Sequence, residues 1–243
     1  MRARLALIFG LLLVLGCLFS PAAAQAPRPS SPMILALGST SWLNVSDIQA
    51  ATGALVKQDM EKYQLKDFAV IVLANVAFTG LPGPVQQGLV EYVTGGGSLL
   101  ITGGPQSFGS GGYQAVAPVI PFQIRSTSDW RPTPFRPPVP IQPGHPILAG
   151  VTFLTVGAVN DMNPRPDASE ILQAAGGGSA AGRAAGAGGG SFPYPLIAEV
   201  GGGAGRVIGV ATDLNDLAGM RDRDLFVRNT IGYLLRTSRM GKG

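Results

Sequence analysis

Short apolar runs alternate with polar and glycine-rich turns through the first half of the chain. Met33 to Leu37 and Phe68 to Ala74 are apolar throughout, and Ser98 to Thr102 is apolar at its centre. Uninterrupted apolar runs bounded by turn residues are typical of strands that are buried on both faces of a parallel sheet. We therefore predict three such strands.

A helix is predicted between the first two strands. Ser46 and Asp47 offer a helix N-cap, because their side-chain oxygens can accept hydrogen bonds from the first backbone N–H groups. Near-helical spacing follows at Ile48, Ala51 and Leu55. The pattern predicts a helix that crosses from one strand to the next.

The second predicted helix lies between Phe68 to Ala74 and Ser98 to Thr102. Pro84 suits a first helical position, where its missing N–H is no loss, and Gly95 to Gly97 mark the end of the helix. One apolar stripe is formed by Val85, Leu89, Tyr92 and Val93. Strand, helix and strand with short connections predict the βαβ unit of a parallel sheet.

The second half of the chain reads mainly as strands. They are expected at Phe122 to Arg125, Phe153 to Val159, Ile171 to Ala174, Leu196 to Val200 and Val207 to Thr212. Gly201 to Gly205 joins the last two as a turn, which favours an antiparallel pair. A closing helix from Asp222 to about Arg236 can turn Phe226, Thr230, Tyr233 and Leu234 toward the sheet. The predicted fold class is α/β, with a mainly parallel sheet and a C-terminal antiparallel extension.

Two segments of biased composition interrupt this pattern. Arg131 to Pro146 is rich in proline and should run extended over the surface, either as a stiff connection or as a partner-binding segment. Gly176 to Ser191 is almost entirely Gly, Ala and Ser, which predicts a flexible loop. We expect one domain over residues 33–236, a leader over 25–32 and a basic tail over 237–243.

The first 24 residues have the layout of a secretory signal peptide. Arg2 and Arg4 precede an apolar run from Leu5 to Phe19, and small residues before Gln25 suit cleavage after Ala24. The run is short for a spanning helix, which needs roughly 20 apolar residues. Gly16 and Cys17 leave open a lipoprotein signal that would anchor the chain through Cys17. Either reading predicts a periplasmic or extracellular protein.

Charge and cysteine content exclude some classes of protein. Without Arg2 and Arg4, 16 basic residues face 14 acidic ones, so the high pI reflects few charges and gives no support to nucleic-acid binding. We interpret Arg236, Arg239 and Lys242 as a solvated tail. Because Cys17 is the single cysteine, the processed domain contains no disulfide.

Several segments together resemble a known family. They are Asp67 to Val76, Tyr92-Val93, Gly95 to Gly97, Thr102 to Pro105, Ser107 to Gly109, Gly111 to Tyr113, His145 to Ile147, Val159-Asn160, Pro195-Leu196, Gly205 to Val207 and Thr212-Asp213. The chain from Met33 to Leu235 is similar to the glutamine-amidotransferase-like domain of uncharacterised bacterial membrane and envelope proteins. The resemblance implies a flavodoxin-like three-layer sandwich related to class I glutamine amidotransferases.

The residues that give class I amidotransferases their activity have no counterpart here. Active members carry a cysteine on a tight strand-to-helix turn and a late His-x-Glu pair. In this chain Cys17 falls in the leader, His145 is the single histidine, and Ile147 stands where the glutamate would be. The resemblance therefore predicts the fold of the class without its triad, and favours a pseudoenzyme over an enzyme.

The glycine-rich loop after Thr102 is the main candidate binding site. Ligands of open α/β sheets bind at the carboxyl ends of strands, where successive glycine N–H groups can form an anion-binding nest. The candidate residues are Gly104, Ser107, Phe108, Gly109, Ser110, Gly111, Gly112, Tyr113, His145, Asn160 and Asp213. We expect them to bind a small polar ligand or an envelope partner, with no cofactor.

Other readings remain open for individual residues. Ser110 lies in a near match to G-x-S-x-G and suggests a hydrolase, although a plain glycine turn explains it better. Asp213 and Asp216, with Asn160 and Asp161, could coordinate a cation or activate a metal-bound water; the alternative is that Asp213 and Asn215 cap a turn. His145 is expected to make structural hydrogen bonds. A scaffold with no ligand pocket is the third hypothesis.

Overall fold

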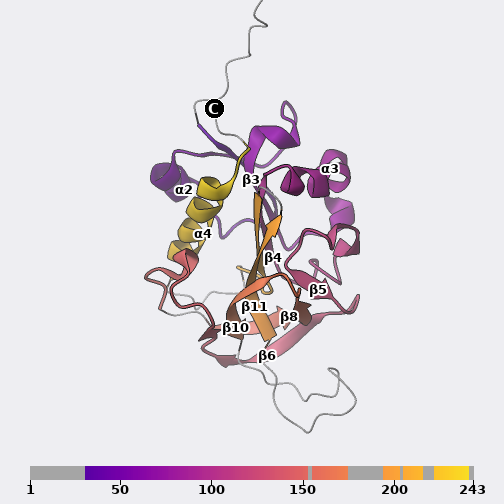
Figure 1. Ribbon diagram of the computed structural model, residues 1–243, viewed down its shortest axis with the longest axis vertical. Helices are drawn as coiled ribbons and strands as arrows, with labels where there is room; N and C mark the ends of the chain where they lie inside the picture. Colours follow the sequence, from indigo (N-terminus) through magenta and orange to yellow (C-terminus); the bar gives the residue numbers. More distant parts are fainter. Residues whose placement is uncertain (1–30, 153–154, 175–193, 203–204, 216–221, 241–243) are drawn as a thin grey trace, which may run out of the picture.

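The computed structural model describes residues 31–152, 155–174, 194–202, 205–215 and 222–240. Its centre is an eight-stranded sheet with the order β2-β1-β3-β4-β12-β11-β10-β7 (Figure 1). The first five strands of this order are parallel: β2 Leu55–Lys57, β1 Met33–Gly38, β3 Phe68–Ala74, β4 Ser98–Thr102 and β12 Gly205–Val210. The last three are antiparallel: β11 Tyr194–Gly202, β10 Ser169–Ala174 and β7 Val139–Pro140. The predicted mainly parallel sheet with an antiparallel extension is confirmed.

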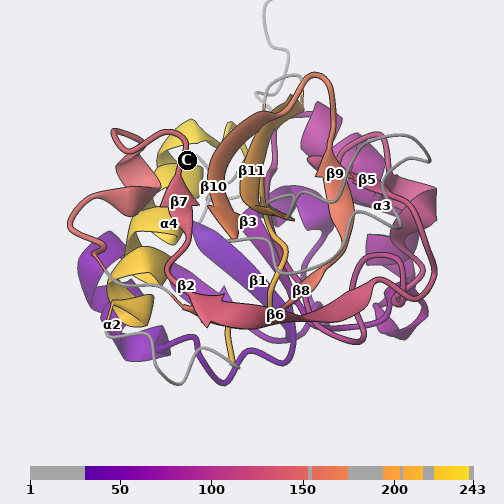
Figure 2. The same cartoon turned by 90° about the horizontal axis from the view of Figure 1, so that it is seen from below.

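Helices cover both faces of the parallel half, which gives the three layers of a flavodoxin-like sandwich. Helices α2 (Val45–Thr52) and α4 (Arg223–Thr237) lie on one face and α3 (Gly83–Thr94) lies on the other (Figure 2). Successive residues of β1 alternate between the two cores: Ile34 packs on the α2 and α4 side, and Leu35 on the α3 side. β1 and β3 are almost entirely apolar because both faces of the sheet are covered there.

Helix α2 begins earlier and ends earlier than the sequence predicted. The N-cap is Asn44, whose Oδ1 accepts hydrogen bonds from the Asp47 N–H (3.1 Å) and the Ser46 hydroxyl (2.8 Å). At the other end Gly53, with φ of 69°, adopts the left-handed conformation that stops a helix. Leu55 therefore starts β2 rather than extending the helical stripe, so that part of the prediction is wrong.

Helix α3 follows the prediction closely. Pro82 is its N-cap and Pro84 occupies the first turn, while the predicted apolar stripe Val85, Leu89, Tyr92 and Val93 is buried. The Tyr92 hydroxyl donates to the carbonyls of Phe68 and Ser98, both at 3.2 Å. A Cβ atom at Gly97 would lie 2.1 Å from the Tyr92 ring, so glycine is required there for the ring to pack.

The proline-rich segment is extended, as predicted, but it pairs as strands. β6 (Trp130–Arg136) pairs with β8 (Val156–Asn160), and β7 forms one edge of the large sheet. A second small sheet joins β5 (Phe122–Ile124) to β9 (Met162–Pro164). Proline is tolerated here because edge and two-stranded positions leave some N–H groups without a ladder partner.

The connections contain short 3₁₀ helices, and the closing helix agrees with the prediction. The 3₁₀ turns are η2 Leu65–Asp67, η3 Phe78–Gly80, η4 Tyr113–Val116 and η5 Pro146–Leu148. In α4 the predicted Phe226, Thr230 and Leu234 are buried, and Tyr233 is half-buried. The predicted signal peptide, residues 25–30 of the leader, the Gly176 to Ser191 segment and the tail beyond residue 240 lie outside the described residues. Within the described part of the chain, no helix has both the length and the apolar character needed to cross a bilayer.

Candidate functional site

The order of the sheet creates a topological switch point between β1 and β3. From β1 the chain enters α2 on one face, whereas from β3 it enters α3 on the other face. The two strands are neighbours, and their last residues, Gly38 and Ala74, are paired. Ligands of open α/β sheets bind in the crevice that such diverging connections leave at the carboxyl ends of the strands.

Asn75, the first residue after β3, lies at this switch point. Its φ is 40°, in the left-handed region that asparagine tolerates better than most residues. Its Nδ2 donates to Asp213 Oδ2 at 2.6 Å, and its Oδ1 accepts from the Gln106 N–H at 2.9 Å. Asn75 therefore connects the segments that follow three neighbouring parallel strands, β3, β4 and β12.

The segment after β12 completes the connection to β1. Asp213 Oδ1 accepts from the Asn215 N–H at 2.8 Å, which confirms the predicted turn cap. Asn215 Nδ2 donates to the Ser39 carbonyl (3.0 Å), and its Oδ1 accepts from the Ser41 hydroxyl (2.5 Å). We call Ser39, Ser41, Asn75, Gln106, Asp213 and Asn215 the switch-point cluster.

Exposure changes steadily across the switch-point cluster. Ser39, Ser41 and Gln106 are exposed, Asn75 and Asn215 are half-buried, and Asp213 is only 5% exposed. The buried carboxylate accepts hydrogen bonds from the Asn75 side-chain amide and the Asn215 backbone N–H. Ser39 and Ser41 are exposed at the rim, where the Ser41 hydroxyl also donates to Asn215. Buried polar groups that are held in place, next to exposed polar side chains, are suited to orienting a small ligand.

Beneath the cluster, the turn after β4 is closed by Asn160. This side chain is fully buried; its Oδ1 accepts from the Gly104 N–H (2.9 Å) and its Nδ2 donates to the Gly104 carbonyl (3.2 Å). A Cβ atom at Gly103 would lie 2.4 Å from Asn160 Oδ1, and one at Gly104 would lie 2.3 Å from the Asn75 amide. The predicted residues Gly104, Asn160 and Asp213 are thus brought together through Asn75, at a turn with no room for a side chain.

The large side chains of the glycine-rich loop belong to the core. Phe108 and Tyr113 are fully buried, and Phe108 keeps a left-handed φ of 46° because its ring packs edge-on against Phe122. The Tyr113 hydroxyl donates to the Val76 carbonyl at 2.9 Å, and Ser107 Oγ donates to the Thr102 carbonyl at 2.7 Å. Burial raises the pKa of Tyr113 well above its ordinary value.

The predicted anion nest exists, and a carboxylate of the chain itself occupies it. The N–H groups of Gly109 and Ser110 each donate to Asp129 at 3.0 Å, and Ser110 Oγ donates at 2.8 Å. Asp129 is 1% exposed. Two further loop residues shape the turn: the Gly111 N–H donates to the Ser107 carbonyl, and Gly112 takes a φ of 78°. The polar groups of the loop are therefore already hydrogen-bonded within the protein. We take the switch-point cluster, and not the loop, as the candidate site.

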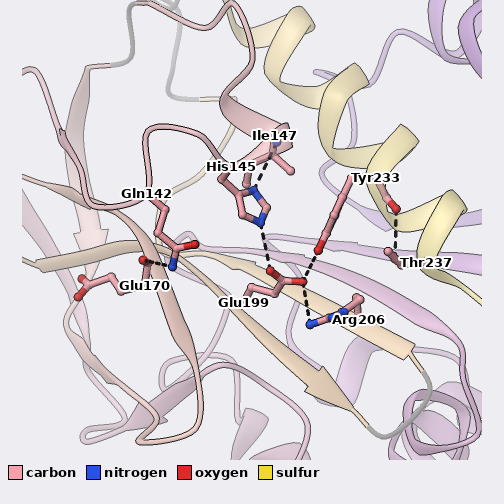
Figure 3. A network of polar contacts seen from close by, with 8 residues as sticks. All are labelled: Gln142, His145, Ile147, Glu170, Glu199, Arg206, Tyr233 and Thr237. Carbon is pink, nitrogen blue, oxygen red and sulfur yellow. Dashed lines mark hydrogen bonds and ion pairs between the residues drawn. The ribbon is translucent and has the colours of Figure 1, made fainter.

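His145 belongs to a separate network on the α4 side of the sheet (Figure 3). The Ile147 N–H donates to Nδ1 at 3.4 Å, so Nε2 carries the proton and donates to Glu199 Oε2 at 3.1 Å. Tyr233 donates to Glu199 Oε1 at 2.7 Å, and an Arg206 nitrogen lies 3.4 Å from the same oxygen. The hydrogen-bonding role predicted for His145 is confirmed.

The environment of this network keeps Tyr233 protonated. Burial, together with the hydrogen bond to Glu199 and the charge of that carboxylate, raises the pKa of Tyr233 to about 12. Glu199 is 7% exposed and each of its oxygens has a partner. A charged residue is almost never buried unless it is paired, so the network explains why a glutamate stands within an otherwise apolar strand.

Sequence reasoning missed three residues that organise these networks. Glu199 had a readable signal, a charge within the apolar run Leu196 to Val200. Asn75 had a weaker one, a polar residue directly after the most apolar strand. Asp129 had none, because its partners are 19 and 20 residues away in the sequence.

The cation site considered as an alternative has no set of ligands in the described part of the chain. No group of three or more His, Cys, Asp or Glu side chains there could hold a metal ion. Both carboxylate oxygens of Asp213 are hydrogen-bonded to asparagines, and Asp216 lies outside the described residues. Asp213 therefore acts in the structure as an organiser of the turn.

No family model matches the sequence, and no curated protein is significantly similar to it. Solved structures are similar in fold. "Cytoplasmic Protein STM3548" from Salmonella typhimurium is 16% identical with a TM-score of 0.61, over 84% of this chain and 98% of that one. "Cytoplasmic Protein STM1381" from Salmonella typhimurium LT2 is 13% identical with a TM-score of 0.63, over 83% and 99%.

A third similar structure carries a family description. It is a putative ThuA-like protein from Bacteroides uniformis, 14% identical with a TM-score of 0.57, over 91% of this chain and 97% of that one. Likeness at this level of identity concerns the fold alone. The chain therefore shares the mixed α/β, flavodoxin-like fold of these structures.

Proposed function

We propose that this chain is an exported, non-catalytic amidotransferase-fold module that binds a small polar ligand at the switch-point cluster. The observation that carries the proposal is Asn75, held in a left-handed conformation while it bridges Asp213 and Gln106. Unusual backbone conformations of this kind persist only where surrounding contacts enforce them, and they concentrate at binding and active sites.

The arrangement of the candidate nucleophile and the candidate base supports the non-catalytic interpretation. Ser110 Oγ donates to Asp129 and makes no contact of this kind with the imidazole, which is bonded to Glu199 instead. The turn at the end of β4 holds Gly103 and Gly104, which are packed too tightly for a side chain, and the described residues include no cysteine. The hydrolase hypothesis therefore gains no support from the arrangement of Ser110 and His145.

The composition of the cluster narrows the class of ligand. The exposed rim offers the hydroxyls of Ser39 and Ser41 and the amide of Gln106, and the floor carries the carboxylate of Asp213. A buried carboxylate disfavours an anionic ligand, whereas neutral hydroxyl and amide groups can satisfy hydroxyls on a ligand. We expect a neutral polyhydroxylated or amide-bearing molecule.

A thermal-shift screen of the purified chain against sugars, cell-wall fragments, amino acids and nucleotides tests the proposal. A ligand at 100 times its dissociation constant should add about 2.7 kcal/mol of stability. The double variant Ser39→Ala/Ser41→Ala removes exposed rim hydroxyls and should abolish the shift, whereas Ser126→Ala/Ser128→Ala removes exposed hydroxyls elsewhere and should retain it.

A third variant separates the cluster from the glycine-rich loop. Ser110→Ala should leave ligand binding unchanged if the cluster is the site. A shift that survives the Ser39→Ala/Ser41→Ala change but disappears in Ser110→Ala would reject the cluster and restore the loop as the site. If no molecule in the panel shifts the melting temperature, capture of an envelope partner becomes the better account.

Export is the second part of the proposal and rests on the N-terminal sequence. Arg2, Arg4, the apolar run and Ala22 to Ala24 support cleavage of a signal peptide. Cell fractionation with an antibody to the folded domain should place the wild-type protein outside the cytoplasm. Cys17→Ser separates the two routes, because only a lipid-anchored protein would lose its membrane association in this variant.

A further inference from the structure

A groove of about 520 Å³ lies on the face of the molecule that carries α2 and α4. These helices are side by side (Figures 1 and 2). Arg228, Gly232 and Arg236 of α4 line one side, and Pro32, Thr52 and Pro146 contribute to the other. Thr52 is the last residue of α2, and Pro32 directly precedes β1, so the groove lies toward the amino ends of the parallel strands. The switch-point cluster is at their carboxyl ends.

Gly232 leaves the space between the two arginines open. Arg228, Gly232 and Arg236 are spaced by four residues, which places them along one stripe of the helix. A Cβ atom at Gly232 would lie 3.4 Å from Arg236 Nη1, so this guanidinium extends back over the glycine. Arg228 lies one turn away on the opposite side of Gly232. Both guanidinium groups therefore border the same open space beside Gly232.

The charged side chains that line the groove are all positive. In the described part of the chain its lining contains two arginines and no carboxylate. Arg228 Nη1 lies 3.7 Å from Asp47 Oδ2, and both side chains are well exposed (43% and 37%), so the pair is weak. Arginine presents a planar set of donors that matches the oxygens of a phosphate.

We propose that this groove binds a phosphate-bearing ligand between Arg228 and Arg236. The sequence suggested a solvated basic tail for Arg236, but the structure places it within α4 at the edge of the groove. Asn229 also lines the groove, and its Nδ2 donates to the Ala149 carbonyl at 2.8 Å, which ties α4 to the segment after η5. The wall opposite the arginines is therefore held in place.

Calorimetric titration with inorganic pyrophosphate tests for a soluble ligand, and co-flotation with vesicles tests for a lipid headgroup. The vesicles contain phosphatidylglycerol or, as the control, phosphatidylcholine alone. Arg228→Gln and Arg236→Gln should each weaken binding by about tenfold or more, because each removes a charge-assisted contact. Arg223→Gln changes an arginine of the same helix outside the groove and should leave affinity unchanged.

Gly232→Ala separates binding from folding. Alanine is the better helix former, so the melting temperature should rise, while the added methyl group narrows the space between the guanidiniums and weakens binding. Pyrophosphate binding that is lost in the groove variants supports a soluble phosphate ligand; selective flotation with phosphatidylglycerol that is lost in them supports a lipid headgroup. Absence of both, or binding that the groove variants do not change, overturns the proposal.

Discussion

The glycine-rich loop and the switch-point cluster both follow parallel strands at the same edge of the sheet, yet they use their polar groups in opposite ways. In the loop, two backbone N–H groups and the Ser110 hydroxyl all donate to the buried Asp129. In the cluster, the buried Asp213 holds two asparagines while Ser39 and Ser41 remain exposed. The loop directs these donors to Asp129, whereas the cluster keeps the side chains of Ser39, Ser41 and Gln106 exposed to solvent. Accessibility, and not glycine content, identifies the candidate site.

The largest expected effect comes from removing the carboxylate that closes the loop. Asp129→Ala should lower the free energy of unfolding by about 3 kcal/mol, because buried donors left without acceptors cost about 1–3 kcal/mol each. Urea unfolding followed by fluorescence measures the change. Asp59→Ala, at an exposed aspartate, should change stability by less than about 0.5 kcal/mol. A loss below about 1 kcal/mol in Asp129→Ala would mean that the loop does not depend on this carboxylate.

A somewhat smaller effect is expected at the turn between the two regions. Gly103→Ala should cost about 2 kcal/mol, since its methyl group would lie 2.7 Å from backbone atoms of Ala211 and Thr212. Gly144→Ala is the matched control, because nothing lies within 4 Å of a Cβ atom there. Equal melting temperatures for the two variants would show that the end of β4 can relax to accept a side chain.

Alkaline pH should lower stability through Tyr113, the buried tyrosine of the glycine-rich loop. Burial raises the pKa of Tyr113, so its contribution to stability is fully present below the unfolded value near 10 and falls as pH rises above it. At pH 11 the loss relative to pH 8 should be about 1.4 kcal/mol from this residue. In Tyr113→Phe the pH dependence should be shallower, although Tyr92 and Tyr233, whose pKa values are also raised, still contribute. Identical slopes for the two proteins would contradict this assignment.

The smallest effect on stability is expected at the rim of the cluster. Ser39→Ala/Ser41→Ala should change the free energy of unfolding by less than about 0.5 kcal/mol, because both side chains are exposed. Chemical denaturation of this variant beside Asp129→Ala gives the comparison directly. A cost similar to that of Asp129→Ala would show that the rim is structural and would weaken its assignment as a ligand-binding surface.

The fold could be predicted where burial produces a recognisable pattern of apolar residues in the sequence. β3 is apolar throughout and β4 is apolar at its centre because both of their faces are covered, and the α3 stripe follows helical spacing. β7 was missed because it is two residues long and its two side chains are exposed. The end of α2 was missed because the left-handed Gly53 outweighed the apolar spacing that continues to Leu55.

The site was less predictable because it depends on contacts between distant residues. Gly104, Asn160 and Asp213 were identified from their positions near strand ends, and they do lie at one edge of the sheet. The sequence could not predict that the loop N–H groups bind a carboxylate of the same chain, because this depends on where the fold places Asp129. The same holds for Asn75 and Asp213, which are 138 residues apart.

The two edges of the central sheet carry a consequence for solubility. β2 spans three residues and β7 spans two, one of them a proline, although the interior strands β3 and β11 span seven and nine. A long, flat edge presents unpaired N–H and C=O groups that can recruit another chain, and short strands and proline limit this. The sheet is thus protected from edge-to-edge aggregation on both sides, so replacing Pro140 with a β-branched residue is a change that should promote self-association.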